Sequence, residues 1–589
     1  MGNLNSKLKI EDKKVIGLLV EKPAITSIRV PTGVIEIKEN TFQECEGLLS
    51  IKFPRSLAKI GKGAFKGCIS LTTVTLPRAL THAGDYAFSD CKELHIVSVP
   101  DSLANIGDHA FSGCHELYSM TLPDCLTHIG ESVFDRCYCL HELKLPKRLS
   151  QLGNRAFCST ALVDITLPES VTHIGDSAFC KCAYLERFHL PSNLKHLGNA
   201  VFSQCTALFS FTVPDCITHL SDQTFSGCTE LESVVLPDTM TSIGDAAFQN
   251  CARLTSITLP NTLSHIGNHS FEGCSKLTSL ALPDSVTHIG EGAFEKCTHL
   301  TSITLPQSLT HIDRSAFTGC KALSSITLPD SLTYLSCNIF GLCNSLTSII
   351  LPKGLTNIGA QAFILCKNLK NIEIPNSVTR VECAAFKDCV KLASLTLSSS
   401  LTHIGEGAFK NCKELNSIIL PKSVKKIGNS AFFSCMMATT IQIPPYVRYI
   451  GRCAFSDCLS ITSVTLPNAA YDNIGKFAFR KCIALKTVIF GLRVPVNFLA
   501  WAVGNSRNRD NWQLTCLKRQ CNVLRLIAAF AEDRRTLKAG VLLQTVFPGC
   551  RNLVLDSFAI KQSVREAIDE YNNQRKQTCI GPNDHLDYC

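Results

Sequence analysis

Residues 64–84 read AFKGCISLTTVTLPRALTHAG, and the same phrase returns about every 23 residues along the chain. Its phenylalanine recurs twenty times, from Phe42 and Phe65 to Phe455 and Phe479. A fixed period of this length, with regularly spaced apolar residues, is typical of a solenoid in which each repeat forms one coil stacked on its neighbours. The sequence therefore predicts an α/β repeat solenoid of about 20 coils over residues 25–490. Coils are numbered here by their phenylalanine, with Phe42 in coil 1.

Two copies depart from the period, and both departures fall between apolar positions. Phe157 is followed by Phe179 after 22 residues, and Phe455 is followed by Phe479 after 24. Inserting or deleting one residue within a strand would turn all the following side chains of that strand to the opposite face. A turn tolerates the same insertion or deletion. We therefore expect both changes to lie in turns.

Within one copy, the apolar residues predict two extended segments. Leu71, Val74 and Leu76 are separated by threonines in the pattern of a strand with one buried face. Pro77 then ends the hydrogen-bonded ladder because it has no N–H to donate. A second extended stretch covers residues 80–84, and a glycine follows it in 15 of the 20 copies. We expect that glycine to serve a sharp bend.

A cysteine stands three residues after the phenylalanine in 19 of the 20 copies, and Thr160 takes its place in the shortened coil. Stacked coils would bring these sulfurs close enough to suggest disulfides. A column of identical inward cysteines is more simply a set of small buried hydrophobes whose S–H groups donate to turn carbonyls, and we expect the column to be reduced. Zinc is not expected, because Cys180 and Cys182 are an isolated C-x-C without a second pair at finger spacing.

These features resemble the BspA-like, or Treponema pallidum-type, leucine-rich repeat proteins. The signature A-F-x-x-C-x-x-L-x-x-I-x-L-P is seen in Ala64-Phe65, Cys68, Leu71, Val74 and Leu76-Pro77, and the resemblance covers residues 25–490. It implies a right-handed leucine-rich repeat solenoid with a parallel β-sheet on one face, used for protein recognition. It brings no catalytic residues. Some members of that family are exported bacterial adhesins.

Both ends of the chain depart from the repeat. Residues 1–24 precede the first strand phrase, which begins at Ile25, and we expect residues 8–24 to cap the open end of the solenoid. Residues 491–589 carry apolar residues at helical spacing and predict a small helical segment. That segment is either a C-terminal cap over the last coil or a module that recruits an effector.

Charge and terminal sequence bear on the partner and the compartment. The net charge is +9 over 589 residues, with no basic stripe of the kind that nucleic acid requires, so no nucleic-acid partner is expected. The N-terminus shows no apolar signal segment, and we expect a cytoplasmic, monomeric protein. Gly2 and Ser6 fit the N-myristoylation pattern and are followed by lysines, which predicts weak membrane association through an acylated Gly2. The alternative is a frayed polar terminus.

Nine of the seventeen histidines occupy one repeat position, directly before an inward residue of the second extended segment. They would form an interrupted column of parallel side chains, which offers a metal ion two neighbours at most, so no metal site is expected. The nine are His82, His128, His173, His196, His219, His265, His288, His311 and His403.

The outward positions of the first strand differ between two parts of the chain. Coils 10 to 14 carry almost only Thr-Ser pairs, which are typical of a solvated sheet face, whereas coils 3 to 8 carry aromatic and charged residues. These departures reflect either drift or selected contact. We predict that they bind a protein partner. They are His95, Tyr118, His141, Glu142, Lys144, Asp164, Glu186, Arg187, His189 and Phe209.

The predicted function is a non-enzymatic scaffold for protein–protein interaction, without a cofactor. An enzyme would need acid and base residues, and the candidates on this face are Glu142, His141, His189 and Asp164. A flat sheet face, however, lacks the burial that shifts pKa values in catalytic sites, so catalysis is not expected. Two alternatives stay open. One is an adhesin exported without a visible signal peptide, and the other is an adaptor whose helical tail recruits an effector.

Overall fold

The computed structural model describes residues 7–22, 25–467, 473–490 and 554–555. Gly2 and most of the lengthened turn before Ile474 lie outside these described residues. So does the helical segment expected over residues 491–589, apart from Val554–Leu555, which form a short strand. The chain divides into two compact units, Met1–His311 and Ile312–Cys589. The described residues contain no α-helix. Accordingly, none of them belongs to a helix long and apolar enough to cross a bilayer.

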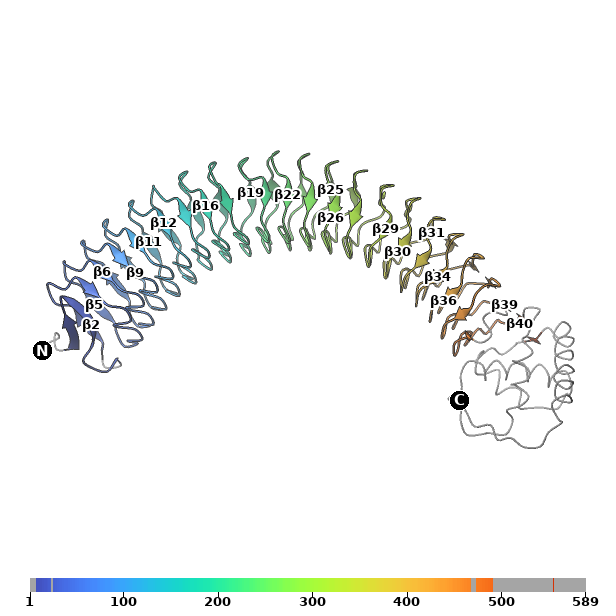
Figure 1. Ribbon diagram of the computed structural model, residues 1–589, viewed down its shortest axis with the longest axis horizontal. Helices are drawn as coiled ribbons and strands as arrows, with labels where there is room; N and C mark the ends of the chain where they lie inside the picture. The colour runs from blue at the N-terminus through green and yellow to red at the C-terminus, as the bar shows by residue number, and fades with distance from the viewer. Residues whose placement is uncertain (1–6, 23–24, 468–472, 491–553, 556–589) are drawn as a thin grey trace, which may run out of the picture. The chain divides into compact units, whose positions relative to one another are not determined.

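Each repeat forms one coil with two short parallel strands and a compact turn region around the phenylalanine. In coil 9, β21 (Ser233–Val235) is the first strand and β22 (Ser242–Ile243) is the second. Paired strands lie about one period apart in the sequence, as Ser233 does from Ser256 and Ser242 from His265. In Figure 1 the coils of each unit follow one another side by side in chain order. The predicted solenoid with parallel sheets is therefore confirmed.

The strands fall into two series, one on each side of the coil. The first-face series is β3 (Ser27–Arg29), β5 (Ser50–Lys52), β7 (Thr73–Thr75), β9 (Ile96–Ser98), β11 (Ser119–Thr121), β13 (Glu142–Lys144), β15 (Asp164–Thr166), β17 (Arg187–His189), β19 (Ser210–Thr212), β21, β23 (Ser256–Ile257), β25 (Ser279–Ala281), β27 (Ser302–Thr304), β31 (Asn371–Glu373), β33 (Ser394–Thr396), β35 (Ser417–Ile419), β37 (Thr440–Gln442), β39 (Ser463–Leu466) and β40 (Thr487–Phe490), which pairs with β41 (Val554–Leu555).

The second-face series follows the proline of each coil, or Ser398 in the coil that contains His403–Ile404. It is β4 (Glu36–Ile37), β6 (Lys59–Ile60), β8 (His82–Ala83), β10 (Asn105–Ile106), β12 (His128–Ile129), β14 (Gln151–Leu152), β16 (His173–Ile174), β18 (His196–Leu197), β20 (His219–Leu220), β22, β24 (His265–Ile266), β26 (His288–Ile289), β28 (His311–Ile312), β29 (Tyr334–Leu335), β30 (Asn357–Ile358), β32 (Arg380–Val381), β34 (His403–Ile404), β36 (Lys426–Ile427) and β38 (Tyr449–Ile450).

Within each unit, the core contains a column of phenylalanine rings, and all twenty of these side chains are fully buried. Successive rings lie parallel, with centroids from 5.0 Å apart for Phe42 and Phe65 to 6.0 Å for Phe179 and Phe202. The shortened coil does not interrupt the column, since the rings of Phe157 and Phe179 lie 5.3 Å apart. The missing residue is absorbed in the turn after Phe157, as the sequence predicted, because the buried positions on both sides keep their register.

The cysteine column confirms the predicted burial and hydrogen bonding. All 19 cysteines are buried, and 17 of them donate their S–H to the carbonyl oxygen of the phenylalanine in the preceding coil. In the first of these bonds, Cys68 Sγ lies 3.1 Å from the oxygen of Phe42. Burial raises the pKa of Cys45 to about 11 and that of Cys68 to about 12, which keeps both thiols protonated at neutral pH.

The turn region has a left-handed residue two positions before and two positions after the phenylalanine. In coil 11 these are His269 and Gly273, with φ of 53° and 74°. The glycine after the second strand, expected to serve a bend, has a different role. A Cβ on Gly267 would lie 2.7 Å from the backbone carbon of Gly244 in the preceding coil, so this glycine is needed because neighbouring coils approach closely.

The N-terminal residues form an antiparallel hairpin, β1 (Leu8–Glu11) and β2 (Lys14–Leu18). Strand β2 pairs in parallel with β4, so the hairpin continues the second-face sheet beyond the first coil. Glu36 on β4 forms two ion pairs: its Oε1 lies 3.3 Å from Lys38 Nζ, and its Oε2 lies 3.4 Å from Lys14 Nζ on β2. The hairpin thereby pairs the ladder edge that an open first coil would expose.

Candidate functional site

The ten residues predicted to bind a partner lie side by side on the first face of coils 3 to 8. His95, Tyr118, His141, Glu186 and Phe209 each follow the buried leucine of their coil, directly before a first-face strand. The other five lie within strands: Glu142 and Lys144 in β13, Asp164 in β15, and Arg187 and His189 in β17. Nine of the ten side chains are exposed, and His141 is half-buried. The structure thus gathers them on one surface.

Aromatic rings cluster at the centre of this surface. The ring of His141 meets the ring of Tyr118 edge-on with centroids 5.3 Å apart, and it meets Tyr184 edge-on at 6.5 Å. Tyr118 is 53% exposed, Tyr184 61% and Phe209 51%, although these are large apolar rings. Exposed apolar groups in such a concentration mark interaction surfaces more often than single scattered ones do.

Sequence reasoning missed three members of this cluster, each for a physical reason. Tyr184 stands in the turn before Leu185, outside the strand positions from which the prediction was made. Val163 follows the buried leucine of the shortened coil, where the missing residue hides its equivalence to Tyr118. Ile96 in β9 is 61% exposed and looks like an ordinary strand residue. We call Ile96, Tyr118, His141, Val163, Tyr184 and Phe209 the aromatic patch.

His141 also links two coils. The first-face ladder is interrupted between β13 and β15, where the coil is one residue short. There, His141 Nδ1 lies 3.0 Å from the carbonyl oxygen of Ala161. Because a carbonyl oxygen only accepts, Nδ1 carries the proton and donates it. The His141 side chain therefore has two roles. Its ring contacts the exposed rings of Tyr118 and Tyr184, and its Nδ1–H connects its own coil to the backbone of the next coil.

The outward threonines of coils 10 to 14 behave differently. Thr278 Oγ1 donates to the carbonyl oxygen of Thr255 at 3.5 Å, and Thr301 Oγ1 donates to that of Thr278 at 3.0 Å. These hydroxyls bond to the backbone of the preceding coil. They form a regular face without aromatic anchors, which agrees with the interpretation of a solvated sheet.

The nine repeated histidines lie on second-face strands, at exposed or half-buried positions. Neighbouring rings stack, with centroids 5.7 Å apart for His265 and His288 and 6.0 Å for His288 and His311. Preceding threonine hydroxyls contact several of these rings, as Thr127 does with Nδ1 of His128 at 2.7 Å. Burial, and then the nearby Arg380 and Lys426, lower the pKa of His403, which favours its neutral form.

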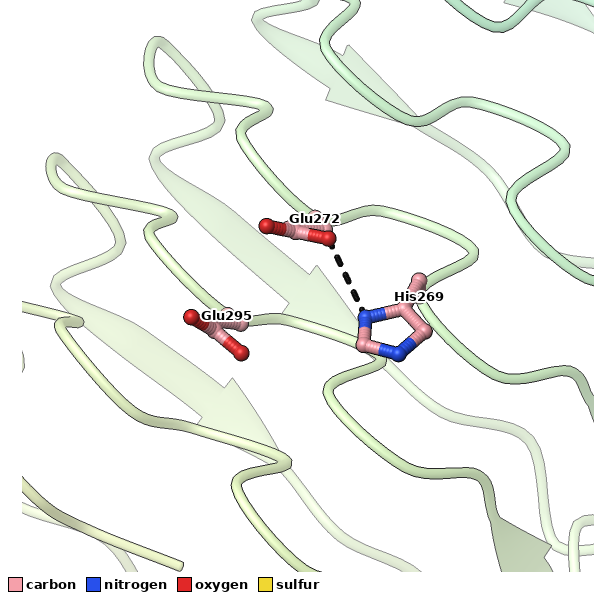
Figure 2. Close-up of side chains that lie close together, drawn as sticks. All are labelled: His269, Glu272 and Glu295. Carbon is pink, nitrogen blue, oxygen red and sulfur yellow. Dashed lines mark ion pairs between the residues drawn. The ribbon is translucent and has the colours of Figure 1, made fainter.

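One cluster of titratable side chains was not predicted from the sequence. His269, Glu272 and Glu295 place one nitrogen and two carboxylate oxygens within 4.8 Å of one another, and no similar cluster occurs elsewhere among the described residues (Figure 2). His269 Nδ1 lies 3.1 Å from Glu272 Oε2. Glu272 and Glu295 occupy the same position of successive coils, directly after the phenylalanine, so stacking brings them together.

A lysine already balances these carboxylates. Lys296 Nζ lies 2.7 Å from Glu272 Oε1 and 3.1 Å from Glu295 Oε1. Burial opposes ionisation of Glu272, yet hydrogen bonds from Lys296 and Gln249 hold its pKa below the usual value. A metal ion would have to displace an ammonium group that satisfies both carboxylates, so the cluster is best described as an inter-coil ion pair.

Replacing Glu272 by glutamine is expected to lower the free energy of unfolding by about 0.5–1 kcal/mol at pH 7. The carboxyl has a lowered pKa in the folded state, so its contribution is present above the unfolded value of 4.5 and is lost as pH falls through the folded value. Urea unfolding of the parent and of Glu272→Gln should therefore converge near pH 3. Asp284→Asn, at an exposed turn position, is the control. A difference that persists unchanged at pH 3 would contradict this assignment.

Comparisons with known proteins agree with this fold. The family described as BspA type leucine rich repeat region (6 copies) matches residues 20–141, 105–232, 218–345, 333–444 and 402–495. No curated protein matches. Among solved structures, a leucine-rich repeat protein from Bacteroides ovatus is 25% identical, with 78% of this chain and 92% of that chain covered and a TM-score of 0.33.

Two further bacterial structures are similar. A leucine rich cell surface protein from Faecalibacterium prausnitzii is 26% identical, covering 65% of this chain and 89% of that one, with a TM-score of 0.30. The Treponema pallidum leucine rich repeat protein is 22% identical, covering 41% and 83%, with a TM-score of 0.19. The family match spans most of the 589 residues and coincides with the phenylalanine and cysteine columns. The chain belongs to the BspA-type leucine-rich repeat family.

Proposed function

We propose that the chain is a non-enzymatic scaffold that binds a protein partner through the first face of coils 3 to 8. The observation that carries the proposal is the aromatic patch, whose exposed rings contrast with the first face of coils 10 to 14, where serine and threonine predominate. Affinity in protein interfaces concentrates in a few aromatic and arginine anchors rather than in small hydroxyl residues. Tyr118, Tyr184, Phe209 and Arg187 are residues of that kind.

The arrangement of charges supports a protein partner. Asp164 and Arg187 occupy paired positions across the β15–β17 ladder, and Glu142 and Lys144 lie on β13. Opposite charges therefore surround the rings, as in the polar rim of an interface. The stacked coils hold this surface in place before binding, so the scaffold loses little conformational entropy when a partner binds.

The non-enzymatic assignment follows from the setting of the acid–base residues. Glu142, Asp164 and His189 are exposed on strands, where water screens their charges, and His141 donates to a backbone carbonyl oxygen. Catalytic pKa values are tuned in enclosed sites rather than on open sheet faces.

The test is affinity capture from a cell extract with the intact chain, identification of the captured proteins by mass spectrometry, and direct binding measurements with each. Capture by the parent that is lost when the anchors of the aromatic patch are replaced supports the proposal. Equal capture by parent and variant contradicts it and makes residues 491–589 the better candidate.

A cytoplasmic, monomeric protein with an acylated Gly2 is part of the same proposal. In a cell with an N-myristoyltransferase, the intact mass is expected to increase by one myristoyl group, and Gly2→Ala is expected to abolish the increase. Because one acyl chain binds membranes only weakly, the modified protein should distribute between membrane and soluble fractions. An unmodified parent terminus in the presence of the transferase would end this idea.

A further inference from the structure

The position directly after the phenylalanine forms a second column along the turn region, which we call the turn-edge column. Coils 3, 4 and 8 carry Ser89, Ser112 and Ser203 there. Coils 6 and 7 carry Cys158 and Cys180, two cysteines that are additional to the buried cysteine column. They are 22 residues apart in the sequence, and the shortened coil makes them neighbours in the stack.

The backbone holds these two coils in close register. The rings of Phe157 and Phe179 stack 5.3 Å apart, and the N–H of Ser159 donates to the carbonyl oxygen of Cys180 at 2.8 Å. Adjacent strands lie about 4.8 Å apart, and disulfides form between Cα atoms separated by about 4.4–6.8 Å. Both cysteines stand directly after a stacked phenylalanine, at the same position of successive coils, so their side chains leave the backbone on the same side of the stack.

The two sulfurs differ in access and in electrostatic setting. Cys158 is fully buried, whereas Cys180 is half-exposed. The hydrogen bond from the Cys158 thiol lowers the pKa of Cys180, with further help from Lys181 and Arg155, although burial opposes the shift. The shared hydrogen bond and burial raise the pKa of Cys158. The lowered pKa favours the thiolate at the half-exposed Cys180, and the raised pKa favours the protonated thiol at the buried Cys158.

The buried cysteine column shows what ordinary stacked cysteines do in this fold. Cys205 and Cys228 also stand in successive coils, but each donates to a phenylalanine carbonyl oxygen, at 3.1 Å in both cases. Burial raises the pKa of both thiols. Both are buried, and their raised pKa favours the protonated thiol, which makes them an internal comparison for Cys158 and Cys180.

We propose that Cys158 and Cys180 form a peroxide-reactive dithiol whose product is a disulfide between coils 6 and 7. The Cys180 thiolate attacks one oxygen of hydrogen peroxide, so that an S–O bond forms and the O–O bond breaks. The departing hydroxide takes a proton from solvent. Cys180 is then a sulfenic acid, oxidised by two electrons, and the peroxide is reduced.

In the second step the sulfur of Cys158 attacks the sulfur of Cys180. The S–S bond forms, the S–O bond breaks, and the departing hydroxide leaves as water with the proton of Cys158. In total, two thiols and one hydrogen peroxide give one disulfide and two waters. The disulfide joins the coils that carry Asp164, Tyr184 and Arg187, but the chemistry does not depend on what those residues bind.

The test is oxidation of the fully reduced full-length protein by hydrogen peroxide at pH 7, followed by alkylation and peptide mapping without reductant. The expected product is a cross-linked peptide that contains Cys158 and Cys180. Cys180 is expected to react roughly tenfold faster than the exposed Cys125, whose equivalent positions in the neighbouring coils are Ser102 and Arg148 rather than cysteines. Cys205 and Cys228 should stay reduced.

Two variants separate the steps. Cys158→Ser should leave Cys180 as a sulfenic acid that dimedone traps, and Cys180→Ser should leave Cys158 reduced. Serine occupies this column in coils 3, 4 and 8, so both variants are expected to fold. Oxidation of the parent protein alone is enough to decide the proposal. It would be overturned if no cross-linked Cys158–Cys180 peptide formed, or if Cys180 reacted no faster than Cys125.

Discussion

Replacing Phe248 by alanine is expected to destabilise the first unit by about 3–5 kcal/mol. The ring is fully buried and lies between Phe225 and Phe271, with centroids 5.5 and 5.2 Å away. Its removal leaves a cavity lined by two rings that are held in place by their own coils, so the gap cannot close by local collapse. The loss of unfolding free energy should therefore lie in the upper part of the range seen for substitutions of buried side chains.

The measurement is urea unfolding of the parent and of Phe248→Ala, combined with hydrogen exchange resolved along the chain. A long repeat array can unfold in parts, and exchange then reports which coils are weakened. We expect the coils around Phe248 to lose protection first. Ser256→Ala, at an exposed first-face position of the same coil, should change the free energy of unfolding by less than about 0.5 kcal/mol. A cost below about 1 kcal/mol for Phe248→Ala would contradict the stacked core.

The triple variant Tyr118→Thr, Arg187→Ser and Phe209→Thr is expected to weaken partner binding at least tenfold, or by about 1.4 kcal/mol. Each new residue occurs at the same position in other coils, as Thr72 and Thr255 do for Tyr118 and Phe209 and Ser210 does for Arg187, and all three side chains are exposed. Folding should therefore be retained while the anchors are lost. His141 is left in place, because its bond to the carbonyl oxygen of Ala161 supports the interrupted ladder.

The matched control makes three changes of the same kind where no aromatic side chains gather: Thr278→Ser, Ser302→Thr and Ser325→Thr. It should bind like the parent at the same salt concentration. Adding Tyr184→Ala to the triple variant should weaken binding further, since Tyr184 completes the ring cluster and alanine occupies its position in the next coil, at Ala207. If the triple variant bound the partner as tightly as the parent, the first face of coils 3 to 8 would not be the binding site.

Most of the core could be predicted because it repeats. The phenylalanine seen at Phe65 recurs twenty times and the spacing of Phe65 and Cys68 recurs in 19 of these copies, so local pattern and tertiary packing carry the same information. The glycine after the second strand was interpreted wrongly. A bend and a close approach both select glycine, and only the coordinates show that the backbone of Gly244 lies where a Cβ of Gly267 would be.

The sequence by itself determined the coil, its buried columns and the outward position of Tyr118, Arg187 and Phe209, since period and alternation set which side chains turn inward. Only the tertiary structure decided which residues of different coils meet. Glu295 meets His269 and Glu272, and Cys180 lies beside Cys158, because the coils stack in register and bring equivalent turn positions together. These inter-coil contacts join residues about one period apart, and no local pattern within a single coil contains them.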